Sequence, residues 1–182
     1  ATVTFLAKGV KAMSYLDYDI ISGCTEGRTM CVTQEGSTIT VNNASYAAVI
    51  DGQGRITSLF DKRANKQVLS APGNDVKYFL DGPQQEDAWN IYRNYMNRQV
   101  QLYTSTSACV TENNDLRTVI HVHNVGDKVD FQQDIIFYHD KDRIDFETTV
   151  DWQERGKVMR VYFPTPMNAP YFTSETGFGA YK

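Results

Sequence analysis

The stretch Gln84–Tyr95, with the sequence QQEDAWNIYRNY, combines aromatic rings with carboxylate and amide side chains. Sugars are bound by aromatic faces that lie against their C–H surfaces, together with polar groups that match their hydroxyls. Asp87, Trp89 and Tyr92 are therefore candidate substrate-binding residues in a loop. The alternative is that Trp89 fills the end of the fold and has only a structural role.

Two further groups of residues resemble metal sites, and each has a simpler interpretation. His121-Val122-His123 would place two imidazoles on one strand face, but a metal site needs three or four ligands. The third histidine, His139, lies in a different turn. Asp140, Asp142 and Asp145 lack the glycine and the glutamate of a calcium-binding loop. Exposed sheet histidines and turn aspartates explain both patterns.

Asp145 and Glu147 form the remaining pattern with possible chemistry. They would lie about 6–7 Å apart on one strand face, and glycosidases use carboxylate pairs at roughly that separation. An acidic ladder on an open sheet face has the same spacing. No GxSxG, HExxH, Walker or GxGxxG motif occurs in the chain. The sequence therefore assigns neither a catalytic residue nor a metal ligand to this chain.

Composition excludes several classes of partner. The 182 residues carry a formal net charge of -4 and no run of Lys or Arg, which argues against nucleic acid. No stretch reaches the roughly 18 apolar residues of a membrane span, so no membrane partner is expected. Three cysteines, Cys24, Cys31 and Cys109, cannot all pair within the chain. Free thiols in a reducing compartment are the simplest interpretation.

The stretch Phe131–Pro164 indicates the fold that positions these groups. Within it, Ile144–Trp152 alternates strictly between apolar and polar residues, which is typical of a half-buried strand. A denser apolar run precedes it and another follows Glu154-Arg155-Gly156-Lys157. Short polar turns separate the three runs, so we expect three consecutive antiparallel strands that form a meander.

Turn signals recur along the rest of the chain every 8 to 12 residues or so, as in a sandwich or barrel. Asp51-Gly52-Gln53-Gly54 is the strongest hairpin signal. The other predicted strands are, in order, 2–6, 14–21, 37–41, 45–50, 55–60, 74–80, 99–111 and 116–125. We therefore predict an all-β, mainly antiparallel, two-layer architecture. Residues 1–33 would be a strand segment of a small β domain or linker, and residues 34–182 the first part of a large β-sandwich domain.

Four motifs resemble, in order and spacing, the C-terminal β region of glycoside hydrolase family 38 α-mannosidases. They are Asp51-Gly52-Gln53-Gly54-Arg55 running on to Lys62, Asp81-Gly82-Pro83 with Asp87-Ala88-Trp89-Asn90-Ile91, Arg143-Ile144-Asp145-Phe146 running on to Glu154, and Val161-Tyr162-Phe163-Pro164. The opening, from Val3 to Tyr18, is similar to the strand pair that precedes this region. The resemblance covers nearly the whole chain and is closest to the cytosolic and bacterial branch, which implies a cytoplasmic location.

The resemblance implies an antiparallel supersandwich of the galactose-mutarotase type. It also implies that catalysis belongs to an N-terminal barrel of the same polypeptide, where zinc and two aspartates carry out retaining hydrolysis of an α-mannoside. No residue of this chain corresponds to them. The chain would thus be a non-catalytic fragment, inactive alone, whose partners are the barrel and, in the intact enzyme, the substrate. Asp87, Trp89 and Tyr92 would line the rim of the sugar site.

One departure from the family pattern is Asn42-Asn43-Ala44, where relatives usually carry an acidic residue before the hairpin.

Two other functions remain open at the sequence level. A stand-alone carbohydrate-binding sandwich could use Trp89, Tyr92 and Tyr95. An aldose epimerase of related fold would need a constellation of His and Glu, which three scattered histidines do not readily supply.

Overall fold

The computed structural model describes residues 3–21, 31–84, 86 and 89–181. Over these residues the protein is all β, apart from one turn of 3-10 helix, η1 (Tyr95–Asn97), which confirms the predicted fold class. Every strand pair is antiparallel. The alternating burial of side chains along the longer strands explains why these segments form sheets rather than helices.

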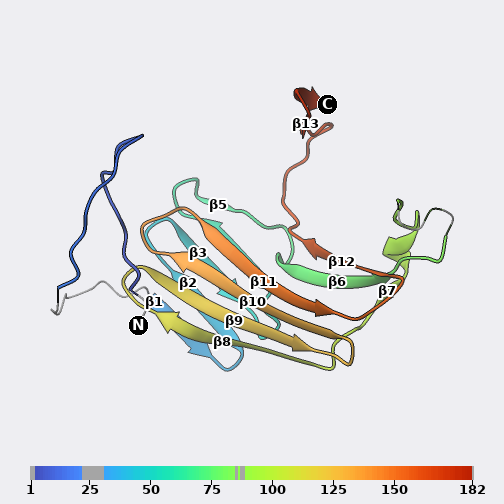
Figure 1. The fold of residues 1–182 in the computed structure, drawn as a ribbon. Coiled ribbons are helices and arrows are strands. Elements are labelled where there is room, and N and C mark those ends of the chain that lie inside the picture. The colour runs from blue at the N-terminus through green and yellow to red at the C-terminus, as the bar shows by residue number, and fades with distance from the viewer. Residues whose placement is uncertain (1–2, 22–30, 85, 87–88, 182) are drawn as a thin grey trace.

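Four sheets account for all the strands of the described residues (Figure 1). A five-stranded sheet has the order β1 (Cys31–Glu35), β2 (Thr38–Asn42), β3 (Tyr46–Ile50), β4 (Ile56–Asp61), β5 (Lys66–Gln67). A four-stranded sheet has the order β11 (Ile144–Trp152), β10 (Val129–Tyr138), β9 (Arg117–Val125), β8 (Ser105–Asn113). A three-stranded sheet has the order β12 (Lys157–Tyr162), β6 (Asp75–Leu80), β7 (Gln99–Val100). A small hairpin joins β13 (Ser174–Thr176) and β14 (Gly179–Tyr181).

The core lies between the five-stranded and four-stranded sheets. Side chains from both inner faces are fully or nearly fully buried there: Ile39, Val41, Ala48, Ile50 and Ile56 from one sheet, Ile120, Val122, Ile135 and Phe137 from the other. Burying a Val, Leu, Ile or Phe side chain contributes about 1.5–3 kcal/mol relative to leaving it exposed. This two-layer packing is the sandwich that the sequence predicts.

The remaining part of the four-stranded sheet packs against β6. Trp152 at the end of β11 stacks on Tyr78 of β6 with ring centroids 6.1 Å apart. Deeper in the same region, the Asn74 amide donates to the Gln133 side-chain oxygen at 2.6 Å. The four-stranded sheet thus contacts both of the other large sheets.

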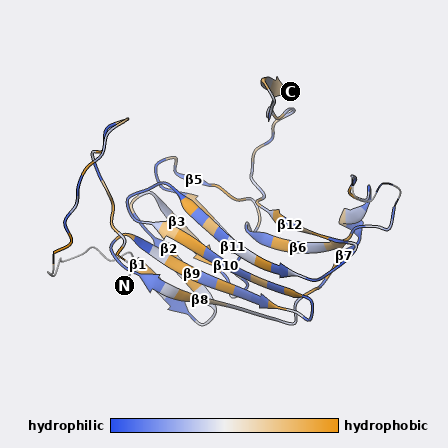
Figure 2. Cartoon of the chain, in the orientation of Figure 1, coloured by the Kyte–Doolittle hydropathy of each residue, from blue (hydrophilic) through white to orange (hydrophobic). Residues whose placement is uncertain are grey.

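Strand β11 shows most of the alternation predicted for it, although Thr148 is exposed and Asp145 is partly buried. Ile144, Phe146 and Val150 are partly buried, whereas Glu147 and Asp151 are exposed. Figure 2 shows the matching alternation of apolar and polar residues along the strands of this sheet. The segment is therefore a strand with one packed face and one solvent face, as predicted.

The prediction of a three-strand meander is wrong in its last member. β12 pairs with β6 of another sheet, in the register Tyr162 to Asp75, and not with β11. The turn after β11 carries the chain across, since Gly156 has a positive φ of 59° and its carbonyl accepts the Asp81 N–H at 2.8 Å. This bond attaches the turn to the end of β6, and β12 continues along that strand.

The two strands predicted before residue 22 are also absent from residues 3–21, which contain no strand. Their apolar side chains are exposed, among them Phe5, Tyr15 and Ile20. The Phe5 and Tyr18 rings pack in a tilted arrangement with centroids 4.8 Å apart, so the segment folds back on itself without a hydrogen-bonded ladder. Alternation alone does not supply the neighbouring strand that a ladder requires. Thr2 lies outside the described residues, as do residues 22–30.

The structure differs from the predicted strands in two smaller respects. The predicted strand 99–111 is broken into β7 and β8 because residues 101–104 cross closely over Gly126, where a Cβ would lie 1.9 Å from the Leu102 carbonyl oxygen. The two-residue strand β5 lies between the predicted strands 55–60 and 74–80, where no strand is predicted. The division at residues 33 and 34 stays a prediction, and β1, which spans it, pairs with β2.

Candidate functional site

The candidate loop leaves the end of β6, returns into β7 and is closed at its base by hydrogen bonds. The Leu80 N–H donates to the Arg98 carbonyl at 2.9 Å, which joins the two ends. Inside the loop, the Tyr92 N–H donates to the Asp81 carboxylate at 2.6 Å. A cis peptide bond joins Gly82 to Pro83. The hydrogen bonds at its base tie the loop to a rigid sheet.

Trp89 lies outside the packed core, with 87% of its surface exposed. Its N–H donates to the Glu86 carbonyl at 2.9 Å, so a local turn holds the residue at this position. The indole therefore does not fill the end of the sandwich, and the structural alternative for Trp89 is wrong. Asp87, the acidic member of the predicted set, lies outside the described residues.

Tyr92, the third predicted residue, is half-buried and stacked against a cation. The Arg98 guanidinium carbon lies 4.7 Å from the centre of the Tyr92 ring. Three residues further on, the Arg160 guanidinium lies 5.3 Å from the centre of the Tyr95 ring, whose edge meets Phe79. Two arginine–tyrosine pairs therefore form at the predicted loop, and each arginine holds the ring of its tyrosine in one orientation.

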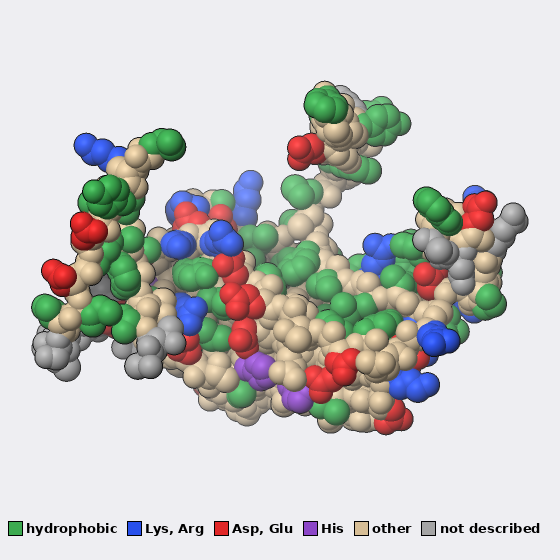
Figure 3. Space-filling model, viewed as in Figure 1, with side chains coloured by type: hydrophobic (Ala, Val, Ile, Leu, Met, Phe, Trp, Pro, Cys, Tyr) green, Lys and Arg blue, Asp and Glu red, His purple; other side chains and the backbone are tan. Residues whose placement is uncertain are grey.

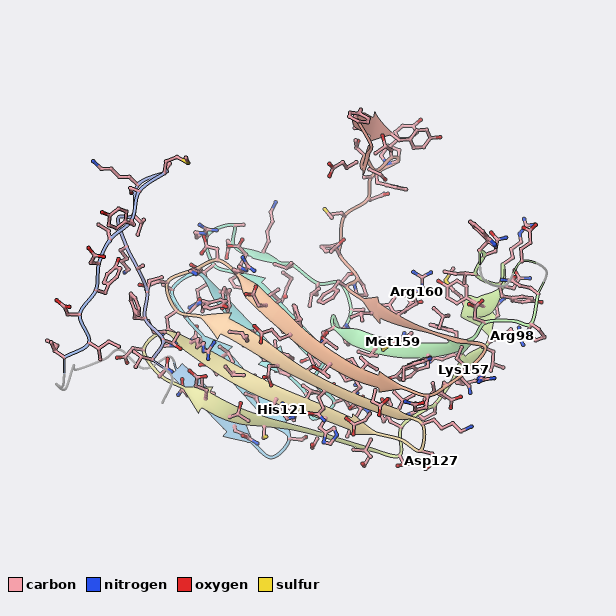
Figure 4. The ribbon with its side chains drawn as sticks, viewed as in Figure 1. Arg98, His121, Asp127, Lys157, Met159 and Arg160 are labelled. Atoms are coloured by element: carbon pink, nitrogen blue, oxygen red, sulfur yellow. The ribbon has the colours of Figure 1, made fainter. Side chains whose placement is uncertain are left out.

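Arg98 and Arg160 are the residues that sequence reasoning missed. Figure 4 shows both at the end of the molecule that carries the loop. Neither forms an ion pair within the described part of the chain, and the buried Nε of Arg160 has no hydrogen-bond partner there. Arg160 lies 65 positions after Tyr95, beyond the reach of any local sequence signal, because only the pairing of β12 with β6 brings it to the loop.

At the turn before β12, an ion pair balances the charge of Lys157. Its ammonium binds the Glu154 carboxylate, and this hydrogen bond lowers the pKa of Glu154. The two opposite charges therefore compensate each other. Arg98 and Arg160, by contrast, have no such acidic partner among the described residues.

The two strand histidines lie on the solvent face of the four-stranded sheet, each bound to an aspartate of β10. His121 Nδ1 lies 2.7 Å from Asp134 Oδ1, and His123 Nε2 lies 2.9 Å from Asp130 Oδ2. The His123 hydrogen bond lowers the pKa of Asp130. Figure 3 shows this row of imidazoles beside acidic side chains. Within the described ranges no three His, Cys, Asp or Glu side chains come together to hold a metal ion.

Asp145, one of the two carboxylates considered as a catalytic pair with Glu147, is held by neighbouring side chains. Asp145 binds Arg143 and accepts a hydrogen bond from the Tyr138 hydroxyl at 3.0 Å, and the Arg143 hydrogen bond lowers the pKa of Asp145. A general acid needs the opposite shift. Asp140 and Asp142 pair with Lys8 and Arg63, at 2.8 and 2.6 Å. These carboxylates therefore act as partners in surface ion pairs.

Comparison with known proteins adds the family. The model of the glycosyl hydrolases family 38 C-terminal domain matches residues 41–182. The chain belongs to this family. Alpha-mannosidase G of Dictyostelium discoideum is 32% identical over 149 residues, which cover 78% of the chain and 14% of that protein. Alpha-mannosidase 2C1 of Homo sapiens is 25% identical over 152 residues, or 81% of the chain and 15% of that protein.

Membership of glycosyl hydrolase family 38 confirms the resemblance found in the motifs, including Asp81-Gly82-Pro83 at the base of the loop. The chain spans about one seventh of the length of the curated relatives that it matches. Within the described residues no helix is long and apolar enough to cross a membrane. The roles of Asp87, Trp89 and Tyr92 in binding stay predictions.

Proposed function

We propose that this chain forms the non-catalytic C-terminal β domain of a retaining, zinc-dependent α-mannosidase. In this proposal a catalytic barrel of the same polypeptide hydrolyses the α-mannoside and holds the zinc ion. The observation that carries the proposal is the family match over residues 41–182. The relatives that share this region are named α-mannosidases. The described residues do not themselves offer a zinc site.

We further propose that the loop 81–97 lies at the rim of the sugar site in the intact enzyme, where Asp87, Trp89 and Tyr92 contact the substrate. Three observations support this role. The Trp89 ring is free to meet the C–H face of a sugar. Hydrogen bonds hold the loop base in place. Arg98 orients the Tyr92 ring by stacking on it.

The test is the activity of the intact polypeptide toward an aryl α-mannoside, with and without a zinc chelator. We expect hydrolysis that the chelator abolishes. In the same enzyme, Trp89→Ala should lower kcat/KM by about fivefold to tenfold, since loss of one well-packed sugar contact costs roughly 1 kcal/mol. Unfolding by urea should be unchanged, because Trp89 is exposed.

Two matched variants separate the aromatic contact from loop distortion. Trp89→Phe keeps an aromatic face and should recover most of the activity. Ile91→Ala removes a half-exposed apolar side chain from the same loop and should leave kcat/KM unchanged. Wild-type kinetics in Trp89→Ala would overturn the rim role alone. An intact polypeptide that does not hydrolyse α-mannosides would overturn the mannosidase assignment.

The proposal includes a cytoplasmic location. Cys109 is a free thiol exposed on β8, and unpaired surface thiols are typical of reducing compartments. Detection of the intact polypeptide in cell fractions tests this point. Its recovery in a secreted or lumenal fraction would contradict it.

A further inference from the structure

A thiol, an imidazole and a carboxylate lie in one row across the solvent face of the four-stranded sheet. Cys109 of β8 is the direct partner of His121 on β9, and His121 is the direct partner of Asp134 on β10. Direct partners in an antiparallel sheet point to the same face, with Cβ atoms about 4.5–5.5 Å apart. The strand register therefore places a nucleophile, a base and an acid side by side.

The burial of the neighbouring residues shows that this row faces solvent. The residues on either side of His121 are buried in the core, and those on either side of Cys109 pack against it. Cys109 is an exposed free thiol, and the side chains of His121 and Asp134 are 32% and 43% exposed. Figure 3 shows the histidines at the surface beside acidic side chains. A small reagent can therefore reach all three groups from solution.

Asp134 prepares the His121 ring to accept a proton. Asp134 Oδ1 lies 2.7 Å from His121 Nδ1, and this is the only hydrogen bond that the ring forms with a described residue. In the neutral ring, a carboxylate at Nδ1 keeps the proton on that nitrogen and leaves Nε2 as the basic site. The same carboxylate stabilises the imidazolium that forms once Nε2 has accepted a proton. The ring thus offers a free basic nitrogen on the face that carries the thiol.

The Cys109 thiol is free to meet this base. It forms no hydrogen bond with a described residue, and a strand side chain has two common rotamers about its first bond. Rotation about this one bond brings the sulfur across the short distance between the paired strands. An imidazole within reach of a thiol takes its proton and generates the thiolate, which is the nucleophilic form.

The charges around the row favour some reagents over others. Glu147 of β11 is the direct partner of Asp134, and Asp130 lies further along the same face of β10. Arg117 is the only lysine or arginine within the four strands, and Glu112 neutralises it. The face around the thiol is therefore acidic. It repels an anionic reagent and admits a neutral or cationic one.

We propose that Cys109 is a reversible modification site, at which a small neutral or cationic disulfide exchanges with the protein thiol. His121 accepts the thiol proton, and the thiolate attacks one sulfur of the disulfide. A new S–S bond joins Cys109 to one half of the reagent as the original S–S bond breaks. The other half leaves as a thiolate and takes the proton from His121. No separate oxidant is consumed, and an excess of the free small thiol reverses the exchange.

The experiment measures the rate of exchange at Cys109 by mass spectrometry of a single peptide. Trypsin cleaves after Arg98 and Arg117, and Cys109 is the only cysteine in the resulting peptide 99–117. Its modification is therefore counted separately from that of Cys24 and Cys31. The folded 182-residue chain is treated at pH 7 with cystamine, 2-hydroxyethyl disulfide or dithiodiglycolate, which are cationic, neutral and anionic.

Each rate is divided by the rate of the same disulfide with a short cysteine peptide, which removes the intrinsic reactivity of the reagent. We expect Cys109 to exceed the peptide at least about tenfold with cystamine and with 2-hydroxyethyl disulfide, because the peptide has no adjacent base. The normalised rate with dithiodiglycolate should be the lowest of the three, because the acidic face repels it.

Variants treated with the neutral disulfide assign the roles of the other two residues. His121→Gln removes the base and should slow the exchange about tenfold. Asp134→Asn, at the positioning residue, should slow it about threefold and should cause no further loss when added to His121→Gln. His123→Gln is the matched control, because His123 lies on the same face and also binds an aspartate. It should react as the wild type does, and urea unfolding checks that each variant is folded.

A second pH separates loss of the base from a change in access to the thiol. At about pH 10 an ordinary thiol ionises without help, so the wild type and His121→Gln should react at equal rates. The groups that face His121 are Asp134 on β10, with Glu147 beyond it, and His123 on its own strand. A deficit in His121→Gln that persists at pH 10 would show that the substitution blocks access, and would overturn the role of the base.

Three further results would overturn the proposal. They are a Cys109 rate no higher than that of the peptide, equal rates in the wild type and His121→Gln at pH 7, and a preference for the anionic disulfide. A loss in His123→Gln as large as that in His121→Gln would also do so, because it would assign the effect to the whole face. None of these results would touch the proposed mannosidase role, which is measured by hydrolysis in the intact polypeptide.

Discussion

Gly54 ends the β3–β4 turn in a conformation and at a place that both require glycine. Its φ of +77° lies in the left-handed region, and a Cβ there would lie 2.5 Å from Val122 Cγ2. Val122 belongs to β9 in the opposite layer, so the turn backbone itself packs on the core. The Asp51 carboxylate accepts the Gln53 and Arg55 N–H groups and sets the turn. The sequence predicts the hairpin, whereas only the structure shows this contact.

Gly54→Ala should therefore be more destabilising than the same change at Gly36. Gly36 has a similar φ of +60° but open space around the position of a Cβ. We expect a loss of about 1–2 kcal/mol in Gly36→Ala from the backbone alone. Gly54→Ala adds overpacking of about 1–3 kcal/mol, for a total of about 2–5 kcal/mol. Urea unfolding of the two variants measures the difference in stability. Equal losses of stability would show that the Val122 side chain moves aside without cost.

The candidate site was only partly predictable from its residues. Trp89 and Tyr92 stand out because aromatic and polar residues gather in one irregular stretch, and their composition is visible without a fold. The exposure of the Trp89 indole could not be inferred, since a loop of the same composition could also bury its aromatic side chains at the end of the sandwich. Arg160 could not be found at all, because it joins the loop through strand pairing across a sheet. Arg98 follows the loop directly, but its stacking on Tyr92 has no signal in the sequence.

At the scale of elements, the β8–β9 hairpin ends in an ion pair supported by its turn. Arg117 Nε and Nη2 donate to the two Glu112 oxygens at 3.0 and 2.8 Å. The Asn114 side chain accepts the Leu116 and Arg117 N–H groups, which closes the turn. The Arg117 hydrogen bond lowers the pKa of Glu112, and the same bond raises the pKa of Arg117. The two shifts agree on a favourable pair.

Glu112→Gln should lose stability at neutral pH and little at low pH. The pKa of Glu112 is lower in the folded state, so its contribution is present above the unfolded value and disappears as pH falls through the folded one. We expect a loss of less than about 1 kcal/mol at pH 7 for this partly exposed pair. The stability difference from the wild type should shrink between about pH 5 and pH 3.

Chemical denaturation across that pH range measures the effect. Glu175→Gln, at an exposed glutamate on β13 that forms no ion pair with a described residue, is the control and should show no pH-dependent difference. A Glu112→Gln deficit that stays constant from pH 7 to pH 3 would exclude the ion pair as its source.

Alternation along the chain predicted strands well and their partners poorly. β3, β4, β9 and β11 fall within a residue or two of the predicted ranges because burial on one face imposes period two. The pairing of β12 with β6 could not be predicted, because the strands are separated by 76 residues and alternation does not encode a partner. The segments 2–6 and 14–21 fail for a related reason. They have strand composition, but the described residues pair no strand with them.

At the scale of the whole molecule, the packed layers contrast with two terminal segments. β9 and β10 have strand neighbours on both sides, and their inner faces are buried. Residues 3–21 and 163–181 instead expose many large apolar side chains, including Tyr15, Ile20, Phe172 and Phe178. Figure 1 shows both segments extending away from the sheets. Stability should therefore be distributed very unevenly along the chain.

Hydrogen exchange of the 182-residue chain measures that distribution. Amides of β9 and β10 should exchange only through global unfolding, at least about 1,000-fold more slowly than unprotected amides. Amides in 5–20 should exchange almost freely, because a short turn, one aromatic pair and the exposed Lys8–Asp140 ion pair are the contacts given for this segment, and none of them forms a ladder. Gly54→Ala should speed exchange in β9 and β10 and leave 5–20 unchanged. Protection of residues 14–21 comparable to that of β10 would show that this segment pairs as a strand, as its alternating sequence predicts.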